Sequence, residues 1–184
     1  MAKAPVLDEF LGPNKRPSWA WLRWFDQLPI LMAYGAFYDT TTQTAGANTA
    51  TVVAIGQTSI SSGVARNGAP SKIAVTTSGV YNFAFSLQLL NTDTATDNVT
   101  VWFQVNGATL ATSASIIGVP SKHGTTPGAT IAAANFFLPL NAGDYVQMVW
   151  ATDLGTSSIK TYAAGVAPVH PVSPGVILTV NQVG

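Results

Sequence analysis

The sequence predicts an all-β sandwich of about ten short antiparallel strands, preceded by an extended arm and one short helix. From residue 33 onward, apolar and polar residues alternate with a period of two, the pattern of a strand with one buried face. In 79–90, every second residue from Tyr81 to Leu89 is aromatic or leucine. Turn pairs such as Asn67-Gly68 separate these segments. Strands at this spacing, without helices between them, are typical of a sandwich.

The N-terminal region divides into the arm and the helix. Residues 1–17 are rich in proline and glycine, which predicts an extended arm. Residues 18–28 predict a helix, because Ser18 can cap the first turn and Pro29 stops the helix. Its apolar stripe comprises Trp21, Leu22, Phe25 and Leu28, and further aromatic surface comes from Trp19 and Trp24.

The strands follow from the alternation and from the turn signals. We expect them at 33–39, 50–56, 71–76, 79–90, 99–105, 109–117, 131–138, 144–150, 158–164 and 175–181. The change of period near residue 33 therefore predicts two domains: an N-terminal arm with its helix, residues 1–32, and a β body, residues 33–184.

Charge is scarce in this chain. Only 9% of the 184 residues are charged, and 8 basic residues balance 8 acidic ones. This balance excludes an electrostatic nucleic-acid binder, which needs an excess of Lys and Arg. There are no cysteines, which excludes disulfides and zinc-thiolate sites. Half of the charges lie in 1–39, and so weakly charged a body is typical of subunits that cover one another in an assembly.

The start of the sequence lacks the long apolar segment of a secretory signal. No apolar run approaches the length of a membrane span, which is about 18 residues. We therefore expect a protein made in a cytoplasm, with no membrane as partner.

The sequence offers few groups for catalysis, and we expect no enzymatic activity, no cofactor and no metal. His123 lies in a Gly/Pro-rich loop and His170 lies between two prolines. Neither has an acidic neighbour in sequence that could orient a general base. Asp93 and Asp97 are the only paired carboxylates of the body. They leave two interpretations open: a calcium site, or turn residues of an inter-strand loop.

Two further segments have structural interpretations. Asp144 follows Gly143, and its side chain can hold that turn. Three prolines, Pro168, Pro171 and Pro174, recur every third residue, which suits a polyproline II segment. Such a segment could be a ligand for an SH3-type domain, but we favour a stiff surface loop that covers a sheet edge.

Three stretches of the body carry a family resemblance. Gly79-Val-Tyr-Asn-Phe83 looks like a glycine–aromatic–x–phenylalanine strand opening, and 99–107 is similar to the strand ending in Asn-Gly that follows it. Leu138 to Val146 looks like an L-x-L-x-x-G-D-x-V turn into a strand. In this order and spacing, they resemble the jelly-roll superfamily of tumour necrosis factor and the complement globular head. The chain departs from this pattern at its C-terminal strand, which lacks an aromatic-x-Gly ending.

The resemblance implies an antiparallel jelly-roll and a homotrimer packed around a three-fold axis. Candidates for the trimer interface are Tyr81, Phe83 and Trp102, although alternation alone does not say which face of the sheet is the intramolecular core. An immunoglobulin-like sandwich is the alternative fold, and it lacks the support of the Gly-Asp-x-Val turn.

The same fold occurs in phage virions, and the N-terminal segment looks like the short Trp-rich anchors of some phage structural proteins. We therefore expect a virion component, a trimeric capsid decoration or head-fibre protein. Its arm would bind other virion proteins through residues 1–28, with Trp19, Trp21, Leu22, Trp24, Phe25 and Leu28 in the contact and with Arg16 and Arg23 at its rim.

Two alternatives stay open. The chain could be a tail-fibre or receptor-binding tip that recognises a host surface glycan or protein. The helix could also pack back on its own body instead of docking on another protein.

Overall fold

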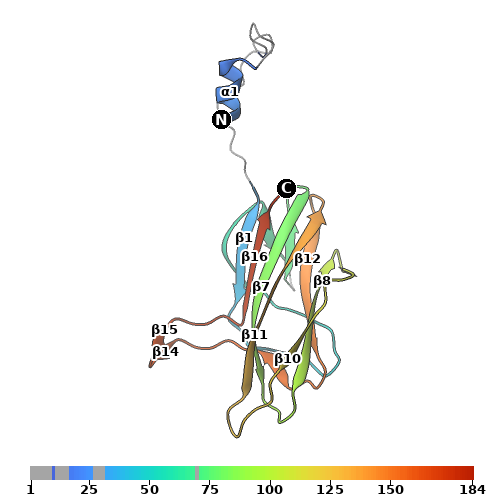
Figure 1. Cartoon of the computed structure of the whole chain (residues 1–184), viewed down its shortest axis with the longest axis vertical. Helices are drawn as coiled ribbons and strands as arrows, with labels where there is room; N and C mark the ends of the chain where they lie inside the picture. Colours follow the sequence, from blue (N-terminus) through green and yellow to red (C-terminus); the bar gives the residue numbers. More distant parts are fainter. Residues whose placement is uncertain (1–9, 11–16, 27–31, 69–70) are drawn as a thin grey trace. The chain divides into compact units, whose positions relative to one another are not determined.

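The computed structural model describes residues 10, 17–26, 32–68 and 71–184. The chain forms two compact units, Met1–Leu31 and Met32–Gly184. Figure 1 traces the chain and labels its elements.

The first unit contains the helix α1, Trp19–Asp26. The Leu22 amide donates to the Ser18 carbonyl (3.0 Å), which places Ser18 at the start of the helix as the sequence predicts. The expected side-chain cap is absent, because the buried Ser18 hydroxyl has no hydrogen-bond partner. The Ser18 amide instead donates to the Phe10 carbonyl (2.8 Å), and the Phe10 ring meets Trp21 edge-on at 5.2 Å between centroids. Phe10 therefore contacts the start of the helix through both its backbone and its ring.

The second unit is the predicted antiparallel jelly-roll, with strands divided between two facing sheets (Figure 1). Both sheets have seven strands, and the one with the longer strands is called the larger sheet. It has the order β2 (Gln43–Thr44), β13 (Ser157–Ile159), β7 (Gly79–Asn91), β16 (Val176–Gln182), β1 (Tyr34–Asp39) and β4 (Gln57–Ser62), with β11 (Gly128–Leu140) also paired with β7. The second sheet has the order β10 (Ser115–Val119), β8 (Asp97–Val105), β12 (Tyr145–Thr152), β6 (Lys72–Val75) and β5 (Val64–Asn67), with β3 (Thr51–Val52) beside β12 and β9 (Ala108–Thr109) beside β8.

A short hairpin of β14 (Gly165–Val166) and β15 (Val169–His170) stands apart from both sheets. The chain crosses from one sheet to the other at β2–β3, β3–β4, β4–β5, β6–β7, β7–β8, β10–β11, β11–β12 and β12–β13. These repeated crossings are what make the sandwich a jelly-roll.

The core lies between the two sheets and is built from the inward set of each alternating strand. At its centre, the Phe103 ring makes edge-on contacts with Phe83, Phe85 and Phe136, with centroid distances of 6.0, 6.0 and 5.3 Å. Trp150 is the largest fully buried side chain.

The prediction that Tyr81 and Phe83 lie in the trimer interface is therefore wrong. Both side chains are fully buried in the core of a single chain, because the aromatic set of β7 is the inward set. Trp102 has the opposite orientation on β8 and is half-buried on the outer side of the second sheet. Of the three, only Trp102 can meet another subunit without unfolding the body.

Most expected strands occur, with shifted ends. The longest, β7 and β11, extend the expected 79–90 and 131–138 by a few residues. No expected strand covers β2, β5, β14 or β15, and the structure also adds β4. All six of its residues are exposed, so it has no alternation of burial to read. The expected strand 158–164 ends at Ile159, where the chain leaves the sheet for the β14–β15 hairpin.

Candidate interaction surfaces

The outer face of the larger sheet carries no charge. We call the outward side chains of β11, β7, β16, β1 and β4 the neutral face. Within the seven strands of this sheet, Asp39 is the only charged residue, and its side chain is buried. In the second sheet, by contrast, Arg66 is exposed and the Lys72 ammonium lies 4.2 Å from the centre of the Tyr145 ring.

The neutral face also exposes large apolar side chains. Ile131 and Phe137 on β11 are 66% and 61% exposed. Between the larger residues lie small ones: Ala36, Thr179, Ala84 and Asn135 follow one another across β1, β16, β7 and β11. Other exposed apolar side chains on this face are Tyr34, Ile60, Val80 and Ile177. A contiguous apolar surface of this kind on a soluble domain marks an interaction site.

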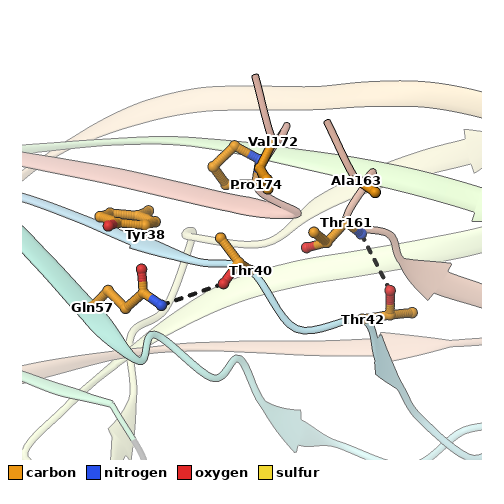
Figure 2. A pocket seen from close by; sticks show the side chains of 8 residues that line it. All are labelled: Tyr38, Thr40, Thr42, Gln57, Thr161, Ala163, Val172 and Pro174. Atoms are coloured by element: carbon orange, nitrogen blue, oxygen red, sulfur yellow. Dashed lines mark hydrogen bonds between the residues drawn. The ribbon is translucent and has the colours of Figure 1, made fainter. Parts of the chain in front are cut away.

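A second feature is a cleft of about 590 Å³ at the root of the β14–β15 hairpin (Figure 2). It is lined by Tyr38, Thr40, Thr42, Gln57, Thr161, Ala163, Val172 and Pro174. The Gln57 amide donates to the Thr40 hydroxyl at 3.3 Å, and the Thr161 amide donates to the Thr42 hydroxyl at 3.3 Å. The cleft thus combines one aromatic ring with hydroxyl and amide groups, and none of its lining residues is charged.

Asp39 holds the backbone next to the residues that line this cleft. Its carboxylate accepts hydrogen bonds from the amides of Thr41 (2.7 Å) and Gly56 (2.7 Å) and from the Thr41 hydroxyl. The Asp39 carbonyl accepts from the Gly175 amide at 3.1 Å, which ties the same strand end to the returning arm of the hairpin. No pattern in the sequence predicts this role, because Asp39 is a lone carboxylate at the end of a strand.

The Asp97 carboxylate is hydrogen-bonded within its own chain. Its buried carboxylate accepts hydrogen bonds from the amides of Leu154 (2.9 Å) and Ser157 (2.9 Å), from the Thr156 hydroxyl (3.2 Å) and from the Thr152 hydroxyl. Burial raises the pKa of Asp97, but these hydrogen bonds outweigh burial and hold the pKa below its usual value.

Asp93 holds its own loop. Its carboxylate accepts from the Ala95 amide (3.1 Å) and from the Thr94 hydroxyl (3.2 Å), and these bonds lower its pKa. The hydrogen bonds of both carboxylates support the interpretation of Asp93 and Asp97 as structural loop residues over that of a calcium site.

The remaining polar candidates lie apart from one another. The His170 ring is hydrogen-bonded to the Pro171 carbonyl (Nδ1···O 2.8 Å), and His123 forms a backbone bridge with Thr126. The described ranges contain no group of three or more His, Cys, Asp or Glu residues that could hold a metal ion.

The expected role of Asp144 is confirmed. Its carboxylate accepts from the Asn141 amide (2.7 Å) and from the Asn106 side-chain amide (2.7 Å), which holds the turn at Gly143. The same contacts lower the pKa of Asp144, the Asn106 side chain most strongly.

Trp19, which is 78% exposed, dominates the described surface of α1. Arg23 lies one turn further along the helix and borders the same shallow hollow, together with Ala20. Leu22 is also exposed, whereas Trp21 is half-buried beside Phe10. The described part of the chain does not include every anchor candidate. It leaves out Arg16 and Leu28, and it leaves out the side chains of Trp24 and Phe25.

Among the described helical residues, no segment has the length and apolar character needed to cross a membrane.

Comparisons with known proteins give a likeness in fold only. No protein-family model and no curated protein sequence matches the chain. Among solved structures, one that matches is the crystal structure of murine APRIL at pH 5.0. It is 16% identical over 83% of this chain and 99% of that chain, with a TM-score of 0.48.

Proposed function

We propose that this protein is a non-enzymatic structural component of a phage virion: a homotrimeric capsid decoration or head-fibre protein, attached through residues 1–28. The observation that carries the proposal is the neutral face, an uncharged surface over five strands with large exposed apolar side chains. The trimeric state and the virion setting come from the sequence resemblance described above.

The physical argument for assembly rests on solvation. Burying one of the larger apolar side chains of this face contributes about 1.5–3 kcal/mol. No charged group has to be desolvated in return, because the outward positions of these strands hold none. The small residues Ala36, Ala84 and Ala133 let a partner surface approach the backbone of this sheet closely.

Replacing Ile177 with arginine is expected to convert the trimer to monomers. Ile177 is exposed on the central strand β16, beside Tyr38 on β1 and Ser86 on β7. In a free chain the new side chain would point into water, but in the trimer its charge would be buried without a partner, at a cost of several kcal/mol. Light scattering after gel filtration, at micromolar concentration, measures the mass directly.

The matched control is Ile116→Arg, because Ile116 is a 72% exposed isoleucine on the second sheet. It should leave the mass of the trimer unchanged. If the unaltered protein is already monomeric at micromolar concentration, or if Ile177→Arg stays trimeric, the neutral face is not the subunit interface.

The exposed residues of α1 support the proposed attachment to the virion through residues 1–28. An exposed tryptophan with an arginine one helical turn away is the composition found at the centres of protein interfaces. A trimer would present three such helices to one particle, and multivalency raises the avidity without any new type of contact.

A receptor-binding tip that recognises a neutral saccharide is the second candidate function, and the cleft at the hairpin root favours it. An aromatic ring can stack on the apolar face of a sugar, while hydroxyl and amide groups bind its hydroxyls. In the cleft, Tyr38 supplies the ring, and Gln57 and the threonines supply the polar groups (Figure 2).

If this second function is correct, Gln57→Ala should weaken binding of a neutral glycan about tenfold, the effect of about one lost hydrogen bond. Gln104→Ala, on the second sheet, should leave binding unchanged. A glycan array identifies the probe, and titration calorimetry measures both variants. The absence of any glycan binding by the unaltered protein would exclude this function and leave the structural proposal intact.

A further inference from the structure

The β14–β15 hairpin projects from the sandwich (Figure 1). The apolar side chains at its tip are exposed. Val166 and Val169 are 90% and 86% exposed. They are cross-strand partners, so their side chains lie on the same face of the hairpin. From Tyr162 to Ser173, this segment contains no Asp, Glu, Lys or Arg.

The hairpin is held together by its own backbone. Tyr162 and Ser173 exchange two hydrogen bonds (3.0 and 2.9 Å), and Gly165 and Val166 pair with His170 and Val169. An isolated two-stranded hairpin is marginally stable in water. Among the described strands, β14 and β15 pair only with each other. An apolar, uncharged hairpin in this position is therefore suited to packing on a second surface.

We propose that the tip of this hairpin is an exchange arm that packs on a neighbouring copy of this chain in the assembly. The inference rests on the proposed trimer and adds a second contact to it. Three observations favour a second copy as the occupant. The hairpin connects β13 and β16, both strands of the sheet that bears the neutral face. The tip and that face both lack charge, so their contact buries no unpaired ion. Finally, the tip reaches beyond its own sandwich, as a contact with a neighbour requires (Figure 1).

The first test changes only the tip. In full-length protein, V166D/V169D should raise the dissociation constant of the trimer at least tenfold in sedimentation velocity over a dilution series. V166T/V169T, which keeps the shape of the side chains and removes less of their apolar character, should have a smaller effect. The matched control I116D, at an exposed isoleucine of the second sheet, should dissociate like the unaltered protein.

The second test leaves the charge of the tip unchanged. The natural chain has no cysteine, so V166C introduces one reactive thiol per subunit. Its reaction with a maleimide should be at least tenfold slower in the trimer than in a monomer that also carries I177R. A cysteine at the control position, I116C, should react at the same rate in both states.

The outcomes separate this inference from the proposed function. If I177R yields monomers while V166D/V169D dissociates like the unaltered protein and V166C reacts equally in both states, the face is the interface and the hairpin is not an exchange arm. The tip would then be free for a partner of another kind. If the unaltered protein is monomeric, both proposals fail together.

Discussion

Replacing Asp97 with asparagine is expected to lower the free energy of unfolding by about 3 kcal/mol at pH 7. The buried carboxylate accepts from the amides of Leu154 and Ser157 and from the hydroxyls of Thr152 and Thr156. An asparagine can keep one acceptor oxygen, but it places an NH₂ group against the remaining donors. At least one buried donor then loses its partner, and such a group costs about 1–3 kcal/mol, more where the lost partner is charged.

Denaturant unfolding measures this difference, and Asp153→Asn is its control. Asp153 lies on the same sheet end but is exposed, and it accepts one hydrogen bond from the Asn98 side chain at 3.0 Å. We expect its replacement to change stability by no more than about 0.5 kcal/mol. Equal effects of the two substitutions would contradict the role given to Asp97.

The same carboxylate predicts a loss of stability in acid. The pKa of Asp97 is lowered in the folded chain, so the folded state binds fewer protons than the unfolded chain as the pH falls. Its contribution is full above the unfolded pKa of about 3.9 and is lost as the pH falls through the folded pKa. Asp93 and Asp144 are shifted in the same direction. The difference between the unaltered protein and Asp97→Asn should therefore shrink from pH 7 to pH 3.

Deleting residues 1–31 is expected to abolish attachment to virions while leaving the body folded and trimeric. These residues form a compact unit of their own, and the jelly-roll strands all lie in Met32–Gly184. If each of the three chains loses even one buried tryptophan contact of about 1.5–3 kcal/mol, the combined avidity falls by orders of magnitude. Co-sedimentation with virions that lack this protein measures attachment, and thermal melting measures the body.

Two point variants test whether the exposed surface of α1 is responsible for attachment. Trp19→Ala should weaken attachment strongly because Trp19 is exposed on α1, whereas Ile116→Ala, on the body, should not. The competing interpretation, a helix packed on its own sandwich, makes the opposite forecast. A truncated body that melts much lower, or that still binds virions, would rule out the anchor.

The strand pattern could be predicted well where burial is one-sided. In β7 every second residue is buried, so the alternation in the sequence reports the two faces directly. It fails in β4, where all residues are exposed, and in the hairpin, where three prolines suggested polyproline II. There, Pro168 lies in the turn and Pro171 and Pro174 fall outside the paired residues, so none of them has to donate a ladder hydrogen bond. Proline spacing alone does not distinguish these two arrangements.

The candidate surfaces were harder to predict, because they depend on which strands become neighbours. Alternation groups Tyr81 with Phe83, but only the pairing of sheets shows that this set is the core. The neutral face gathers residues from strands as distant in sequence as β1 and β16. The aromatic ring of the cleft, Tyr38, lies on β1, and the cleft forms only where β1 comes near the segment that returns from the hairpin.

The pairing of β1 with β16 has a consequence for biosynthesis. Tyr34 lies opposite Asn181, and β16 also separates β1 from β7 in the sheet. Until β16 has emerged from the ribosome, β1 and β4 therefore cannot pair with the rest of the sheet, and one edge of β7 stays largely unpaired. Such edges favour aggregation, so nascent chains and fragments that lack the C-terminal strand should depend on chaperones. Since the neutral face is complete only when β16 is inserted, subunits can recognise one another only after translation of that strand has finished.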